Sequence, residues 1–104
     1  MRYLILFVMT FAAPAAAQKF DAMQLAANLG TVIGSEATCG LTLKQEAITA
    51  FIEKNAPKDD MSFPQTLTMM TQGTEFNNQS LSASAKTAHC AAVTQSARHF
   101  GLID

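Results

Sequence analysis

The chain has few of the residues on which many binding sites depend. It contains no Trp, its single Tyr is Tyr3, and its charged residues are scattered without a run of either sign. Sites that stack sugars or bases on aromatic rings rely on Trp and Tyr, so their scarcity disfavours such sites. Eight acidic residues against seven basic ones give a net charge of −1. Because nucleic acids and anionic membranes attract basic clusters, neither is an expected partner.

Residues 1–17 have the pattern of a cleavable signal peptide. Arg2 supplies the positive charge, residues 3–13 form an uncharged and mostly apolar run, and Ala15-Ala16-Ala17 offers the small residues of a cleavage site. The apolar run is shorter than the roughly 20 residues of a membrane-spanning helix. We therefore expect cleavage near Gln18, no stable membrane anchor afterwards, and a periplasmic or secreted mature protein.

Cysteine is also scarce, since Cys39 and Cys90 are the only two. In an exported chain of this length an even count predicts a disulfide. The chain-entropy model gives such a bridge roughly 4 kcal/mol, comparable with the net stability of about 5 kcal/mol that is common in small domains. A reactive thiol at Cys90, next to His89, is disfavoured because sequence neighbours in a helix point to different faces. We expect the bridge to staple the first interhelical loop onto the last helix.

Four segments of the mature chain have helical periodicity, and none has the strict alternation of a strand. The first follows the N-cap Asp21 and ends at Gly34, with Gly30 weakening its middle. The second begins at Thr42 and stops before Pro57. Their apolar stripes consist of Leu25, Leu29, Val32 and Ile33 in the first, and of Leu43, Ala47, Ile48, Phe51 and Ile52 in the second.

The third helix follows the cap Ser62, and Gly73 either ends or softens it. The stretch Asn77-Asn78-Gln79-Ser80 is typical of a loop. The apolar stripe of this helix consists of Phe63, Leu67 and Met70.

The fourth helix follows the cap Ser82 and runs to about Phe100. Gly101 and Leu102 then suit a Schellman ending. The core-facing side of this helix consists of Lys86 at its outer end, Cys90, Val93, Ala97 and Phe100. The sequence therefore predicts an all-α fold, in which residues 18–104 form a single compact bundle of about four short helices that is closed by Cys39–Cys90 and preceded by the signal peptide helix.

A metal site would have to use Met61, Met69, Met70 and His89. Thioether and imidazole ligands suit copper. However, methionine at helical spacing usually fills core space, and His89 and His99 lie about 15 Å apart along one helix. No metal and no cofactor is therefore predicted, and a copper or small-ligand carrier that uses these residues is the alternative.

No catalytic constellation is recognisable, so the chain is not expected to be an enzyme. Neither histidine lies in a nucleophile motif, and His99, in the last turn of its helix, suits an interaction with the helix dipole. Asp59 and Asp60 lack the glycine and the final glutamate of an EF-hand, so they are expected to form a solvated turn. A hydrolase would need a polar cleft that holds a histidine beside a hydroxyl or a carboxylate.

Four segments carry a resemblance: Cys39-Gly40-Leu41, Ala50-Phe51-Ile52-Glu53, residues 69–74 (Met-Met-Thr-Gln-Gly-Thr) and residues 84–90 (Ser-Ala-Lys-Thr-Ala-His-Cys). They resemble segments of a group of short exported helical proteins of alphaproteobacteria with one cysteine pair and no established function. In outline the chain also resembles the small periplasmic acid-stress chaperones, although it shares no motif with them. The expected function is non-enzymatic binding of another protein in the periplasm, as an envelope-stress or accessory factor.

Overall fold

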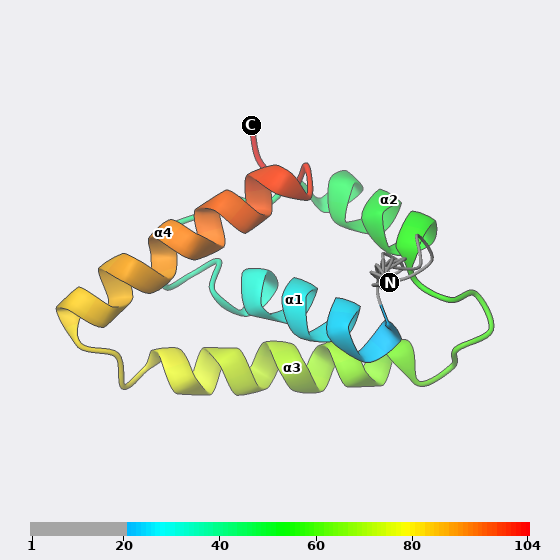
Figure 1. Cartoon of the computed structure of the whole chain (residues 1–104), viewed down its shortest axis with the longest axis horizontal. Coiled ribbons are helices and arrows are strands. Elements are labelled where there is room, and N and C mark those ends of the chain that lie inside the picture. Colours follow the sequence, from blue (N-terminus) through cyan, green and yellow to red (C-terminus); the bar gives the residue numbers. More distant parts are fainter. Residues whose placement is uncertain (1–20) are drawn as a thin grey trace, which may run out of the picture.

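The fold is given by a computed structural model in which residues 21–104 are described. These residues form four helices and no strand (Figure 1). The helices are α1 (Ala22–Gly34), α2 (Gln45–Asn55), α3 (Phe63–Asn78) and α4 (Ala83–His99). The predicted all-α bundle with one disulfide is confirmed. The predicted signal peptide, residues 1–17, and the cleavage expected near Gln18 lie outside the described residues.

α1 and α3 lie side by side and run in the same direction (Figure 1). α1 begins as predicted, because the Asp21 carboxylate accepts the backbone N–H of Met23 at 3.3 Å. Phe63, at the start of α3, packs on Leu25 and Ala26 near the start of α1. This end of the helix pair forms a small apolar cluster of its own.

Two glycines of α1 allow the helix pair to approach closely. A Cβ added to Gly30 would lie 2.7 Å from the Cβ of Met70. A Cβ added to Gly34 would lie 2.6 Å from the carbonyl oxygen of Thr71 and 2.8 Å from the Cβ of Thr74. From the sequence, Gly30 is expected only to weaken the middle of α1. In the structure it also makes room for α3.

The main core lies where α4 and the segments flanking α2 meet α1. Its fully or almost fully buried members are Leu29, Val32, Leu43, Val93, Ala97 and Leu102. The predicted stripe of α2 packs against this core, and the rings of Phe51 and Phe100 lie 5.0 Å apart between their centroids. α4 runs back obliquely across the α1–α3 pair (Figure 1), so the helices do not form an up-and-down bundle.

The end of α4 confirms the predicted Schellman motif. Gly101 has a φ of +75°, which a residue without a side chain adopts without strain. The N–H of Leu102 donates to the carbonyl of Ala97 at 2.8 Å, and the N–H of Gly101 donates to that of Arg98 at 3.0 Å. Leu102 is completely buried, so the turn returns the chain to the core.

The predicted start of the second helix at Thr42 is wrong, because α2 begins at Gln45. The chain before it stays extended, and its N–H groups are used in tertiary contacts. The N–H of Leu43 donates to a carboxylate oxygen of Glu36 at 2.8 Å, and the N–H of Lys44 donates to the carbonyl of Leu102 at 2.9 Å. This arrangement places the side chain of Leu43 in the core.

The prediction of a loop at residues 77–80 is wrong for its first two residues. α3 continues through Asn77 and Asn78, and Gly73 lies within it on an exposed face. Asn78 is buried, because its place on the helix continues the row of Leu67, Thr71 and Thr74 that faces α1. The helix therefore extends as far as α1 offers a surface to pack against.

Candidate functional site

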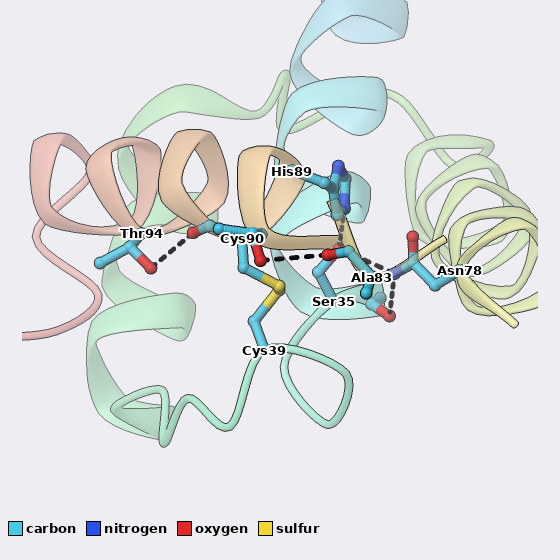
Figure 2. Close-up of a disulfide and its surroundings, with 9 residues drawn as sticks. Ser35, Cys39, Asn78, Ala83, His89, Cys90 and Thr94 are labelled. Atoms are coloured by element: carbon cyan, nitrogen blue, oxygen red, sulfur yellow. Dashed lines mark hydrogen bonds between the residues drawn. A yellow bond between two sulfur atoms is a disulfide. The ribbon is translucent and has the colours of Figure 1, made fainter. Parts of the chain in front are cut away.

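The disulfide joins the loop after α1 to the middle of α4, as predicted. Cys39 and Cys90 are bonded, with their Cα atoms 5.3 Å apart (Figure 2). Both residues are half-buried. The bridge therefore holds α4 against the end of α1, and no free thiol occurs among residues 21–104.

A buried polar cluster lies beside the bridge, where α1, α3 and α4 meet (Figure 2). The hydroxyl oxygen of Ser35 lies 2.9 Å from Nε2 of His89. The side-chain nitrogen of Asn78 lies 3.1 Å from the same hydroxyl and 3.5 Å from the carbonyl oxygen of Gly34. Ser35 is completely buried and Asn78 is 8% exposed, so each needs the partners it has here.

The contacts of Asn78 have a fixed direction. The carbonyl of Gly34 can only accept, so the Asn78 amide must present its NH₂ group to it and to Ser35. The Ser35 hydroxyl therefore accepts from Asn78, and the tautomer of His89 sets whether the hydroxyl donates to Nε2 or accepts from it. The other ring nitrogen, Nδ1, is turned away from Ser35 in Figure 2.

A serine beside a histidine is the geometry expected of a hydrolase, but two features argue against that chemistry. A nucleophilic hydroxyl has to reach a substrate, whereas Ser35 has an exposure of 0%. The base of a triad is oriented by a carboxylate on its other nitrogen, and within residues 21–104 no hydrogen bond joins Nδ1 of His89 to a carboxylate. The cluster serves to connect three helices.

The sequence does not reveal the roles of Ser35 and Asn78. Ser35 directly follows the predicted helix end at Gly34, and Asn78 lies in the predicted loop. The available signal was the spacing of Leu67, Thr71, Thr74 and Asn78, which places all four on one face of a continuous helix. Their partners on α1 and α4 follow from the tertiary fold alone.

The structure does not bring the four candidate copper ligands together. Met61, in the loop before α3, is 91% exposed, and Met69 is 65% exposed on α3. Met70 packs in the small cluster around Leu25. His89 contacts Ser35 near the opposite end of α3, about 12 Å along that helix from Met70. A copper-carrying role stays a prediction, which native mass spectrometry with Cu(I) would test.

The acidic residues 59–60 belong to the turn that precedes α3. Asp60 accepts hydrogen bonds from the hydroxyl and from the backbone N–H of Ser62, and both bonds lower the pKa of the Asp60 carboxyl. The predicted cap Ser62 does directly precede α3, but its side chain makes no capping bond to the helix. Its hydroxyl hydrogen is directed to Asp60 instead, which stiffens the turn.

A largely apolar hollow opens where α2 ends and α3 begins. Its volume is about 560 Å³. The residues that line it are Ile52, Glu53, Ala56, Pro57, Lys58, Asp60, Met61, Phe63 and Pro64. Of its three charged members, Glu53 and Lys58 are exposed and Asp60 is half-buried, so an apolar occupant would be bordered by charges of both signs.

Comparisons with protein-family models, with curated proteins and with solved structures give no match. Among the described residues, no helix has the length and apolar character needed to cross a bilayer.

Proposed function

We propose that this chain is an exported periplasmic protein that acts without catalysis, by binding an apolar segment of another protein in the hollow between α2 and α3. The observation that carries the proposal is that hollow, together with the side chain of Met61 at its edge. Met61 is 91% exposed and lines the hollow, so its thioether side chain is available to an apolar occupant.

The chemistry of the lining favours a partner with apolar side chains. Ile52, Ala56 and Phe63 contribute apolar surface, and Phe63 is itself held in place by Leu25 and Ala26. A thioether is flexible and polarisable, so Met61 can adapt to side chains of different shape. Such a surface suits the exposed apolar segments of partly unfolded envelope proteins, which is the activity of an envelope-stress factor.

The disulfide supports the same assignment. A structural bridge between Cys39 and Cys90 persists in an oxidising compartment and is rare in the cytosol. A small domain that is closed covalently keeps its binding surface under conditions that unfold its clients. The buried state of Ser35 supports the non-enzymatic part of the proposal.

The test is suppression of aggregation by a periplasmic client protein that has been unfolded in acid and returned to neutral pH. We expect the exported protein to slow the aggregation, and Met61→Asp to remove most of the effect because it places a charge at the apolar hollow. The matched control is Met69→Asp, which changes another exposed methionine outside the hollow and should leave the suppression intact. Equal loss in both variants, or no suppression by the unmodified protein at any pH, would contradict the proposal.

A further inference from the structure

A second hollow, of about 410 Å³, lies between α2 and the residues at which α4 ends. One side of it is formed by residues of α2 between Ala47 and Asn55, and the other side by His99, Phe100 and Gly101. No residue lines both this hollow and the one between α2 and α3. The two sites are therefore separate, and binding at one does not depend on the function of the other.

Three neighbouring rings belong to the lining of this hollow. The centroids of Phe51 and Phe100 lie 5.0 Å apart, and those of Phe100 and His99 lie 5.8 Å apart. Both phenylalanines pack against the main core and are only half-buried, so each ring is held in place and keeps accessible surface. Aromatic pairs prefer centroid separations of about 4.5–7 Å. An aromatic ligand in the hollow would therefore extend an existing row of rings.

The ionisable side chains at this hollow are all basic. Lys54 and His99 line it and are exposed, whereas no aspartate or glutamate lines it. Neither of the two belongs to an ion pair within residues 21–104. Asn55 adds a donor, because its amide nitrogen uses one hydrogen on the carbonyl of Phe51 at 2.9 Å and carries a second. The polar part of the lining therefore complements a negative charge.

The combination of rings and basic side chains selects among ligands. A cation would suit the ring faces, but the ammonium group of Lys54 would repel it. A carboxylate attached to an aromatic ring uses both parts of the lining. Lys54 and His99 also lie in the last turns of α2 and α4, where the partial negative charge of a helix end attracts basic side chains. If that were their only role, binding would not depend on the charge of the ligand.

We propose that the hollow between α2 and the end of α4 binds a small aromatic carboxylate. The ring of the ligand lies against Phe51 and Phe100, and its carboxylate pairs with Lys54 and His99. The volume of the hollow equals the liquid-phase share of about fourteen water molecules. It therefore accommodates a single ring that carries a short acidic arm.

The test uses phenylacetate as the probe, with the disulfide intact, at neutral pH and about 0.1 M salt. The readout is the NMR shift of the backbone amides of Ala50 and Gly101, which line the hollow. We expect saturable shifts with a dissociation constant of about 1 mM, as is usual for so small a ligand. Lys54→Gln should weaken binding by about threefold, the effect of one exposed ion pair. The matched control is Lys58→Gln, which removes the same charge from an exposed position outside the hollow and should leave binding within about 1.5-fold of the unmodified protein.

Two related compounds decide the chemical class. Phenylacetamide keeps the ring and lacks the charge, so it should bind about threefold or more weakly than phenylacetate. Acetate lacks the ring and should give no saturable shift up to about 10 mM. Equal or tighter binding of phenylacetamide, or the same affinity for phenylacetate in both lysine variants, would overturn the assignment of an anionic ligand. Binding of acetate as tight as that of phenylacetate would overturn the aromatic part, and absence of a saturable shift with phenylacetate up to about 10 mM, roughly ten times the expected constant, would overturn the site.

Discussion

The hydroxyl of Ser35 and the imidazole of His89 lie 2.9 Å apart and connect the end of α1 to α4. Asn78 donates to the same hydroxyl, so the contact extends to α3. Cys90, which is bonded to Cys39, directly follows His89 in α4. A covalent link and a hydrogen-bonded link therefore act at the same junction, and together they determine how α4 crosses the α1–α3 pair.

The first prediction concerns the amide in this junction. Asn78→Ala removes the donor to Ser35 and to the carbonyl of Gly34, and it leaves both groups buried without that partner. A buried polar group that loses its hydrogen-bond partner destabilises the fold by about 1–3 kcal/mol. The free energy of unfolding, measured by urea denaturation, should therefore fall by that amount. Asn77→Ala is the control, since Asn77 is exposed on the same turn, and it should change stability by less than about 0.5 kcal/mol. Similar losses of stability in both variants would mean that the buried hydrogen bonds from Asn78 to Ser35 and Gly34 are not formed in solution.

The second prediction contrasts two glycines, each in the middle of a helix. Gly30→Ala places a Cβ 2.7 Å from the Cβ of Met70, and overpacking of this kind costs about 1–3 kcal/mol. Gly73→Ala meets no atom within 4 Å, so only the gain in helix propensity of about 1 kcal/mol remains. Thermal melts should therefore show a lower melting temperature for Gly30→Ala and a higher one for Gly73→Ala. Stabilisation by both substitutions would show that α1 and α3 are not in close contact.

The apolar pattern of the sequence predicts the four helices because each of them turns one stripe to the core. Val93 and Ala97 are buried on the expected face of α4, and the Gly101-Leu102 ending is formed as expected. The pairing of Cys39 with Cys90 followed from there being only two cysteines.

The features that the sequence did not predict all depend on partners far away in the chain. The start of α2 is delayed because Leu43 and Lys44 donate to Glu36 and Leu102. The Ser35–His89 contact joins residues separated by 54 positions. Local propensity carries no information about such pairs, which is why the predicted loop at Asn78 and the predicted helix start at Thr42 are wrong.

The third prediction concerns the disulfide. Cys39 and Cys90 are separated by 51 positions, and the chain-entropy model assigns about 4 kcal/mol to a loop of this length. Reduction should therefore lower the melting temperature by about 15 °C or more for a domain of this size. Circular dichroism melts with and without reductant would measure the shift, with thiol labelling to verify that the bridge is open. An unchanged melt of the verified reduced protein would show that α4 is held in place without the bridge.

The last prediction concerns an exposed ion pair that joins the start of α2 to the end of the chain. The ammonium group of Lys44 donates to the carboxylate of Asp104. This hydrogen bond, and secondly the attraction between the two charges, lowers the pKa of Asp104 and raises the pKa of Lys44.

The two shifts define the pH window in which the pair contributes to stability. Because the folded-state pKa of Asp104 is lowered, its contribution is present above the ordinary pKa of aspartate and is lost as the pH falls through the lowered value. Because the pKa of Lys44 is raised, its contribution is present below the ordinary pKa of lysine and is lost as the pH rises through the raised value. Both groups are exposed, so the effect should be small and weakened by salt.

An NMR titration of the Asp104 carboxyl tests the pair directly. Lys44→Gln removes the ammonium group, so the titration midpoint of Asp104 should move up toward its ordinary value, and added salt should move it in the same direction. Lys54→Gln removes another exposed charge, at the other end of α2, and should leave the midpoint unchanged. If Lys44→Gln also leaves it unchanged, Asp104 is not held by Lys44 in solution, and the start of α2 is connected to the chain end by the backbone bond from Lys44 to Leu102 and by the burial of Leu43 and Leu102 in one core cluster.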